Sequence, residues 1–243
     1  MVTTLQTFYY NRQTPRCYRG NKINLVRSLQ WSVITCLVAL GSLSRVENDY
    51  RASVLIYHNA NANSITETVV DWKLKGPEIE VKGARGSYDT LWMPSLSGDG
   101  NIVAIGSAIK TENPIERYEL QVLAYRYDEA LGDWIELPVH TNLEMKGSHL
   151  VQFSTSLSGD GRVLVVGDSG AGIVEVLHLS DEEGAYIPVK GNAELKGVEG
   201  SDDLFGYSVA VSSDGKQLAS GAPQAVVAGE RVGSVSVFEM STN

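Results

Sequence analysis

One short phrase, repeated along the chain, constrains the fold more than any other feature of this 243-residue sequence. Ser-Leu-Ser-Gly-Asp-Gly occurs twice and a related Val-Ser-Ser-Asp-Gly once, at residues 95–100, 156–161 and 211–215. Each copy runs into a short apolar segment that ends in a glycine, at Gly106, Gly167 or Gly221. An internal repeat with a period of roughly 50 to 64 residues predicts that every copy forms the same supersecondary unit.

Each copy contains signals for three strands, and most copies contain a signal for a fourth. Asp-Gly favours a hairpin turn, because a type I′ turn needs positive φ at both central residues, so one strand precedes the turn and one follows it. Alternating apolar residues predict a third strand, at residues 120–125, 173–177 and 234–238. A segment with a shared aromatic position predicts a fourth strand, at residues 71–74, 133–137 and 185–189.

The register of the repeat indicates an earlier copy that has lost its Asp-Gly. Leu-Val-Ala-Leu-Gly-Ser at residues 37–42 aligns with Ile-Val-Ala-Ile-Gly-Ser at residues 102–107, and residues 54–57 align with residues 122–125. Ser-Val-Ile-Thr stands where the turn should be. We therefore expect a basic N-terminal arm or targeting segment at residues 1–27, followed by four repeats at residues 28–83, 84–147, 148–197 and 198–243.

Four strands per repeat are typical of the blades of a β-propeller, in which four-stranded sheets surround a central axis. We expect an all-β fold, a small propeller of about four four-stranded blades. The last copy ends at residues 234–240, before its aromatic fourth strand. The ring is therefore either incomplete or closed by the N-terminal segment, in which case residues 22–26 would pair with the last blade.

Two short motifs in the last copy resemble a known repeat family. Phe205-Gly206 and Gly221-Ala222-Pro223 resemble the motifs that give FG-GAP repeats their name. The copies at residues 95–107 and 156–168 resemble the same family with these motifs lost, and similar Ser-x-Ser-x-Asp-Gly repeats occur in large bacterial and algal repeat proteins. The resemblance covers about residues 28–240 and implies a propeller, but such folds carry many unrelated functions.

Integrin-type members of this family bind calcium in the loop between the two motifs, through several alternating acidic or amide side chains. Each corresponding loop here offers a single acid, Asp99, Asp160 or Asp214. Calcium takes six to eight oxygen ligands, usually from several carboxylates, so these aspartates are only weak calcium candidates. We expect no cofactor.

The charge distribution bears on partners and location. The net charge of −9 argues against a nucleic-acid partner. The first 46 residues contain six basic residues and no acidic one, as in a targeting segment or an arm that docks on an acidic body. Residues 31–42 have the order of a signal peptide but are too short to span a bilayer comfortably, and the repeat register favours a core strand. We expect membrane contact only if residues 31–42 act as a signal or anchor, and a secreted, surface or targeted location all stay open.

One group of residues suggests catalysis and another a metal pair, but their repeat positions favour structural roles. Gly-Asp-Ser-Gly-Ala-Gly at residues 167–172 looks like the nucleophile loop of a serine protease, yet it occupies the position of a glycine turn in the other copies. Two histidines share one repeat position with an arginine and a glutamate, which is typical of a solvated strand end: His58, Arg126, His178 and Glu239.

Aromatic and acidic groups have similar structural interpretations. Trp72, Trp134 and Tyr186 share one position, which favours packing between blades over a carbohydrate-stacking surface. The acidic pair Asp202-Asp203, flanked by small polar residues, reads as part of a solvated loop. No residue stands out as catalytic.

We therefore expect a non-enzymatic scaffold that binds a protein partner through its loop faces, because loops on a rigid scaffold commonly carry function. The residues expected to make contacts lie in the most variable loops and are Asn59, Asn61, Asn63, Glu112, Asn113, Arg117, Asp128, Glu129, Glu230 and Arg231. The alternatives are a secreted or cell-surface adhesion or carbohydrate-binding module, a fragment of a longer repeat array, and a propeller hydrolase with acids in its central channel.

Overall fold

The structure is a computed structural model that describes residues 24–32, 37–46, 49–59, 72–81, 94–110, 118–143, 153–189, 194–198 and 202–240. Every regular element in these segments is a β-strand, which confirms the expected all-β class. In the same segments there is no helix of the length and hydropathy needed to cross a membrane.

The first two antiparallel sheets follow one another along the chain. The first contains β1 (Asn24–Ser32), β2 (Leu37–Val46), β3 (Asp49–Asn59) and β4 (Trp72–Leu74) in that order, and β5 (Ile79–Val81) pairs back onto β3. The second contains β6 (Ser95–Leu96), β7 (Ile102–Lys110), β8 (Tyr118–Asp128) and β9 (Asp133–Leu137). Each sheet is an up-and-down meander, as in a propeller blade.

The third and fourth sheets repeat this plan. The third contains β10 (Phe153–Leu157), β11 (Val163–Asp168), β12 (Ile173–Ser180) and β13 (Ala185–Pro188), and β14 (Glu194–Lys196) pairs back onto β12. The fourth contains β15 (Ser208–Val211), β16 (Gln217–Ala222) and β19 (Ser234–Glu239). A separate hairpin of β17 (Val226–Val227) and β18 (Glu230–Arg231) interrupts it between β16 and β19.

The repeat register expected from the sequence is confirmed. In every sheet the same repeat position of the third strand faces the start of the second strand, in the pairs Leu37–His58, Ile102–Arg126, Val163–His178 and Gln217–Glu239. Residues 37–42 lie in β2, so the earlier copy without Asp-Gly exists. The aromatic segments supply β4, β9 and β13, as predicted.

The expected pairing of the N-terminal segment with the last blade is wrong for the residues that the structure describes. Residues 24–26 pair with residues 42–44 of β2, as the first strand of the first sheet. The strand β1 also crosses the expected boundary between residues 27 and 28. Within the described residues the fourth sheet has three strands, which agrees with the prediction that the last copy lacks its aromatic fourth strand.

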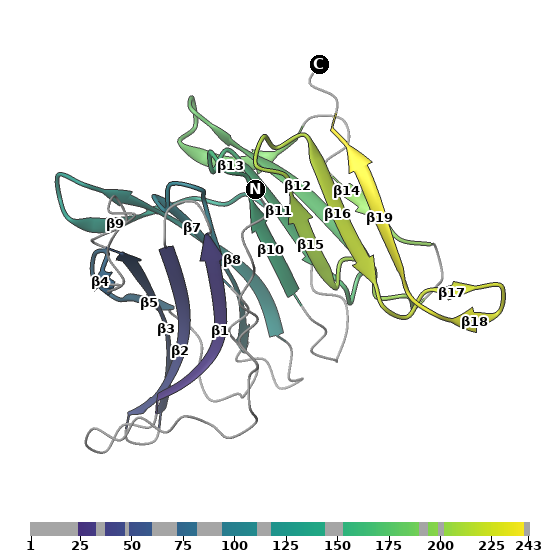
Figure 1. The fold of residues 1–243 in the computed structure, drawn as a ribbon, viewed down its shortest axis with the longest axis horizontal. Coiled ribbons are helices and arrows are strands. Elements are labelled where there is room, and N and C mark those ends of the chain that lie inside the picture. The colour runs from purple at the N-terminus through teal and green to yellow at the C-terminus, as the bar shows by residue number, and fades with distance from the viewer. Residues whose placement is uncertain are drawn as a thin grey trace, which may run out of the picture.

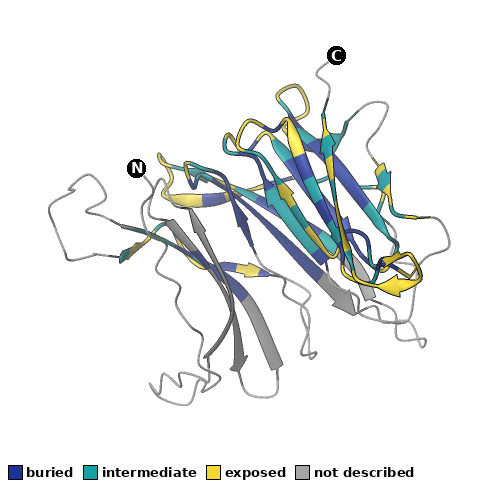
Figure 2. Cartoon of the chain, turned by 45° about the vertical axis from the view of Figure 1, so that its right-hand side comes forward, coloured by how far each residue is buried: buried dark blue, intermediate teal, exposed yellow. Residues whose placement is uncertain are grey.

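The sheets stand side by side in chain order and form an open arc, with the first sheet at one end and the fourth at the other (Figure 1). Three apolar cores lie between them. Ile56, Val103 and Ile105 belong to the core between the first and second sheets. Buried side chains are dense in the third sheet, whereas β19 and the β17–β18 hairpin carry many exposed ones (Figure 2).

Each inner sheet buries both of its faces. In β11, Leu164 and Val166 pack toward the second sheet, whereas Val165 points the other way and packs toward the fourth. Side chains alternate across a strand, so a sheet covered on both faces needs apolar residues at consecutive positions. This explains the continuous apolar segment after each repeated turn.

The segment that leads into the fourth sheet passes close to the third. Phe205 is buried and packs edge-on against Phe238, with the ring centroids 6.2 Å apart. The Gly206 carbonyl accepts a hydrogen bond from Ser154 Oγ at 2.9 Å. A Cβ on Gly167 would lie 2.3 Å from that same carbonyl oxygen, so the close approach requires glycine there.

Candidate functional site

The three repeated turns share one hydrogen-bond network. In each turn the serine two residues before the aspartate donates to the aspartate Oδ1 at 2.6 Å, in the pairs Ser97–Asp99, Ser158–Asp160 and Ser212–Asp214. The same Oδ1 accepts the backbone N–H two residues further on, and the serine Oγ accepts the next N–H along. The repeated phrase therefore builds a self-contained turn.

The turns also bond to one another across the sheets. The Gly98 N–H donates to the Gly159 carbonyl at 2.8 Å, and the Gly159 N–H donates to the Ser213 carbonyl at 2.9 Å. A Cβ on Gly98 would lie 2.9 Å from the Gly159 oxygen, so this row of turns needs small residues. The row fixes the spacing of the last three sheets.

These bonds hold the pKa of each turn aspartate below its usual value. For Asp214 the hydrogen bond from Ser212 is the main cause. For Asp99 and Asp160 partial burial acts in the opposite direction, but the serine and backbone hydrogen bonds outweigh it. Among the described residues no group of three or more His, Cys, Asp or Glu side chains is arranged to hold a metal ion. One carboxylate oxygen of each aspartate is committed to its turn.

The protease-like sequence at residues 167–172 is a hairpin turn, as its repeat position predicted. It joins β11 to β12, and Asp168 Oδ1 accepts the backbone N–H groups of Gly170 and Ala171, each at 3.0 Å. Asp168 is buried, and burial raises its pKa. Its carboxylate closes the turn, and within the described residues it makes no hydrogen bond to a histidine.

Two of the three residues in the aromatic position are buried between sheets. The Trp134 indole Nε1–H donates to the Lys75 carbonyl at 3.0 Å, and the Trp134 ring packs against Tyr127 with centroids 5.2 Å apart. Tyr186 is fully buried and donates its hydroxyl to the Gly161 carbonyl. Trp72 is half-buried. Trp134 and Tyr186 therefore hold the sheets together and offer no ring face to a sugar.

The residues expected to make contacts are only partly described. Asn59 ends β3, and the residues outside the described segments are Asn61, Asn63, Glu112, Asn113 and Arg117.

The described members of this set lie on two separate turns. Asp128 and Glu129 belong to the turn between β8 and β9, where Asp128 Oδ1 accepts two backbone N–H groups of its own turn. Glu230 and Arg231 form β18. The two turns lie at opposite ends of the strands (Figure 1), so the structure does not bring them together.

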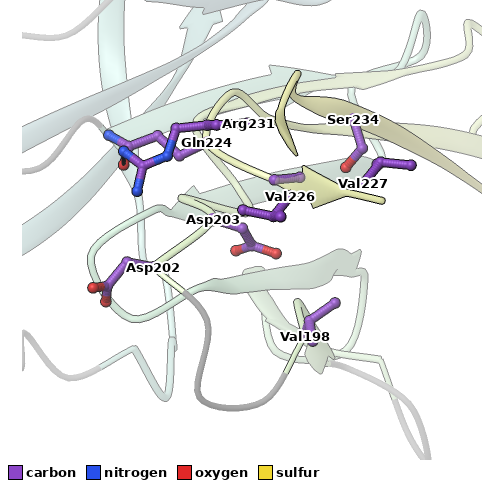
Figure 3. Close-up of a pocket in the computed structure, with 9 residues that line it drawn as sticks. Val198, Asp202, Asp203, Gln224, Val226, Val227, Arg231 and Ser234 are labelled. Carbon is purple, nitrogen blue, oxygen red and sulfur yellow. Dashed lines mark hydrogen bonds between the residues drawn. The ribbon is translucent and has the colours of Figure 1, made fainter. Parts of the chain in front are cut away.

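A groove of about 480 Å³ lies beside the β17–β18 hairpin of the fourth sheet. Arg231 is the predicted contact residue that lines it. The other lining residues come from the end of the third sheet, the segment before β15 and the hairpin region, and are Val198, Asp202, Asp203, Gln224, Ala225, Val226, Val227 and Ser234. Figure 3 shows Val198 across the groove from the hairpin valines.

One backbone hydrogen bond joins the two walls of the groove, and a side-chain bond fixes the segment before β15. The Gln224 N–H donates to the Asp203 carbonyl at 3.0 Å, and Asp203 Oδ1 accepts the Phe205 N–H at 3.0 Å. Ala228 and Gly229, at the hairpin tip, have φ values of 54° and 87°, as a two-residue hairpin turn requires. The hairpin is thus a two-residue β-hairpin, and it forms one wall of the groove.

The groove combines an apolar wall with two acidic residues and one basic residue. Val226 and Val227 are 60% and 55% exposed. Arg231 Nη1 donates to Gln224 Oε1 at 2.9 Å, and these two side chains lie together in Figure 3. Asp202 is exposed, and no ion pair joins it to Arg231 in the described part of the chain. A serine nucleophile needs a neighbouring base, and the lining residues include no histidine, lysine or cysteine.

The hairpin wall of the groove was predicted from the sequence as a variable loop, but the opposite wall was not predicted. Asp202 and Asp203 were both expected in a solvated loop, yet Asp203 is buried and caps the Phe205 backbone. Val198 follows β14, and its part in the groove depends on the third and fourth sheets meeting. The Val-Val pair in a loop was the available signal for an exposed apolar wall.

No family model and no curated protein matches this sequence. Among solved structures, hydrazine synthase from Kuenenia stuttgartiensis is similar, with a TM-score of 0.54 and 14% identity, over 90% of this chain and 60% of that one. Alpha-L-arabinanase from Penicillium chrysogenum has a TM-score of 0.47 and 13% identity, over 89% and 58%. The β-propeller domain of Cps50 (Swd1) from Myceliophteria thermophila has a TM-score of 0.39 and 9% identity, over 89% and 84%.

The chain spans less than two thirds of the hydrazine synthase and arabinanase chains. At such low identity, structural similarity informs the fold alone. Three meanders of four strands and a fourth sheet of three share one register and pack face to face around an arc, which agrees with the similarity to hydrazine synthase. The chain has a β-propeller fold.

Proposed function

We propose that the protein is a non-enzymatic binding scaffold and that the groove beside the β17–β18 hairpin holds an extended segment of a protein partner. The observation that carries the proposal is the exposure of Val226 and Val227 on the wall of a groove that also contains Asp202 and Arg231. Apolar surface rimmed by polar groups is typical of an interaction site. An extended segment with one apolar side chain and flanking charges fits this surface.

The hairpin offers a second means of recognition. Among the strands that the structure describes, each hairpin strand has a single partner strand, so the two-stranded ribbon has unpaired edges there. An extended peptide can add to such an edge through main-chain hydrogen bonds, and side-chain pockets then supply specificity. This mode agrees with a groove that lies along the hairpin.

We also infer that the repeats are of the FG-GAP-like type. Phe205 is buried in the core between the third and fourth sheets, and the Gly206 N–H donates to Ser220 Oγ at 3.0 Å. Gly206 has a φ of 86°, which favours glycine. The two residues of this motif therefore have separate structural reasons to be Phe and Gly, which supports the assignment.

The experiment is a selection of random peptides displayed on phage against the full chain, followed by fluorescence anisotropy with a selected peptide. Val226→Asp puts a charge on the apolar wall and should weaken binding at least tenfold, about 1.4 kcal/mol. Leu131→Asp is the matched control, because Leu131 is an exposed apolar residue on the β8–β9 turn. Binding that Val226→Asp leaves unchanged would contradict the proposed site.

A further inference from the structure

The fourth sheet exposes the face that the other three sheets bury. Two positions of the third strand of each sheet define this face. From the first sheet to the fourth, the residues at these positions are Val54 and Ile56, Val122 and Ala124, Val174 and Val176, and Val235 and Val237. In each sheet they pair with the glycine of the repeat and with the residue two positions before it. The four pairs are therefore equivalent by register.

Their burial divides the four sheets into two groups. Val174 and Val176 are 0% and 3% exposed, because the fourth sheet covers them. Val235 and Val237 are 72% and 70% exposed. The fourth sheet thus has the residues of an inter-sheet interface without a sheet to cover them in the described part of the chain.

The repeated interface also shows what kind of surface fits this face. The cover of Val174 and Val176 consists of aliphatic and aromatic side chains on the facing sheet, which are Val209, Val211, Leu218 and Phe238. The partner of Val235 and Val237 must therefore be an apolar sheet face with the same strand spacing.

The first sheet carries such a face at the opposite end of the arc. Leu55 and Tyr57 occupy the register positions of Leu123 and Tyr125, which pack in the core between the first two sheets. Leu55 and Tyr57 are half-buried. One chain therefore has both halves of the repeated interface, at its two ends.

We propose that the fourth sheet of one copy of this chain docks on the first sheet of a second copy, and that two copies close into a ring. Head-to-tail contacts close into a ring when their rotation permits, and two chains of four sheets give eight, within the range known for propellers. The proposed contact continues the repeated interface between sheets and does not involve the groove. Residues 1–23 of the same chain, or another protein, are the other occupants that the experiment must distinguish.

The first experiment measures molar mass by size-exclusion chromatography with light scattering, using the full chain. We expect twice the chain mass of 26.3 kDa for the wild type and the single mass for Val237→Asp. Leu131→Asp is the control and should keep the wild-type mass. A monomeric wild type, or a dimer that Val237→Asp leaves intact, would overturn the proposal. Cooperative unfolding of Val237→Asp shows that the variant is folded.

The second experiment tests the head-to-tail direction by mixing two blocked variants. Leu55→Asp blocks the first sheet and Val237→Asp blocks the fourth, so each variant alone should be monomeric. In a mixture, the open fourth sheet of Leu55→Asp can dock on the open first sheet of Val237→Asp and form a dimer with one junction. A mixture that stays monomeric while both variants unfold cooperatively would exclude head-to-tail docking.

Discussion

The third and fourth sheets make the same face from the same kind of residues and differ in what lies against it. Val174 and Val176 are covered by the next sheet, whereas Val235 and Val237, at the same register positions, are exposed. The residues paired across the sheet with Val174 and Val235 are both glycines, Gly167 and Gly221. Burial on this face is therefore decided by the neighbouring sheet and not by the strand sequence.

The largest expected difference in stability comes from placing a charge on the covered face of the third sheet and, separately, on the exposed face of the fourth sheet. Val176→Asp would bury a carboxylate without a partner and should destabilise the chain by more than about 3 kcal/mol, or prevent folding. Val237→Asp should change the stability of the dilute monomer by no more than about 0.5 kcal/mol, because surface substitutions rarely cost more. Denaturation with urea measures both values.

One result for Val237→Asp would contradict the difference between the two sheets. If Val237→Asp destabilises dilute protein as much as Val176→Asp does, then the face is covered by the chain itself. In that case the difference between the two sheets would disappear in solution.

Replacing Gly167 or Gly221, which occupy the same repeat position, should give the next largest change in stability. A Cβ on Gly167 would meet the Gly206 carbonyl at 2.3 Å and Val209 Cγ1 at 2.9 Å, both from the neighbouring sheet. Gly167→Ala should therefore cost about 2 to 3 kcal/mol through overpacking. A Cβ on Gly221 would closely approach only Ser208, within its own sheet, so Gly221→Ala should cost less than about 1 kcal/mol.

Unfolding free energies of the two alanine variants, measured side by side, check this difference. Equal losses would mean that Gly221 also faces a tightly packed neighbour. Equal and negligible losses would mean that the Gly206 segment can move away from the third sheet.

A buried carboxylate in the third sheet has a smaller, pH-dependent effect. Glu175 is fully buried, accepts hydrogen bonds from Thr141 Oγ1 and the Asn142 N–H, and its pKa is raised by burial. The folded state therefore binds this proton more tightly than the unfolded chain, and stability falls as pH rises through the raised pKa. Glu175→Gln should be more stable than wild type at pH 7, by about 1 kcal/mol.

The advantage of Glu175→Gln should shrink as pH falls below the raised pKa, because the wild-type side chain then becomes neutral too. Urea denaturation at a series of pH values measures it. A difference that stays constant with pH would show that Glu175 does not titrate in the folded state. The fourth sheet has Ser236 at this position, so no such pH dependence is expected there.

The repeated turns should show the smallest effect. The hydrogen bonds that lower the pKa of Asp160 stabilise the fold at neutral pH, and this contribution is lost as pH falls through the lowered pKa. Asp160→Asn should cost about 0.5 kcal/mol or less at neutral pH, because the carboxylate is largely exposed. Asp214→Asn, at the end of the row of turns, should have the weaker effect. Loss of either difference at low pH is the expected signature, and its persistence there would contradict the hydrogen-bond explanation.

Most of the fold was predictable from the repeated phrase. Asp-Gly predicted a hairpin turn correctly, but the turn is not of the expected type I′, because only the glycine has positive φ, at Gly100, Gly161 and Gly215. The alternation of apolar residues determines which side chains lie on each face of a sheet. The register then recovered the first copy at residues 37–42 without its turn, and it identified residues 167–172 as a turn. These inferences succeeded because they depend on local geometry that every copy must share.

The groove was only half predictable. Arg231 was found from the variable loop, but the opposite wall lies before β15 and after β14, where Asp202 and Val198 come from different sheets. The predicted strand partner of residues 24–26 was wrong for a similar reason. Their sequence is compatible with pairing at either end sheet, and in the structure they pair with β2 of the first sheet. No short-range signal specifies which distant segment a strand or loop will meet.

The sequence by itself determined the turns, the strands, their register and the apolar character of both sheet faces, because these follow from backbone conformation and residue alternation. The tertiary structure decided which faces are covered. Val176 and Val237 belong to the same pattern and have opposite environments, because burial depends on a neighbouring sheet that the pattern of a single repeat does not encode.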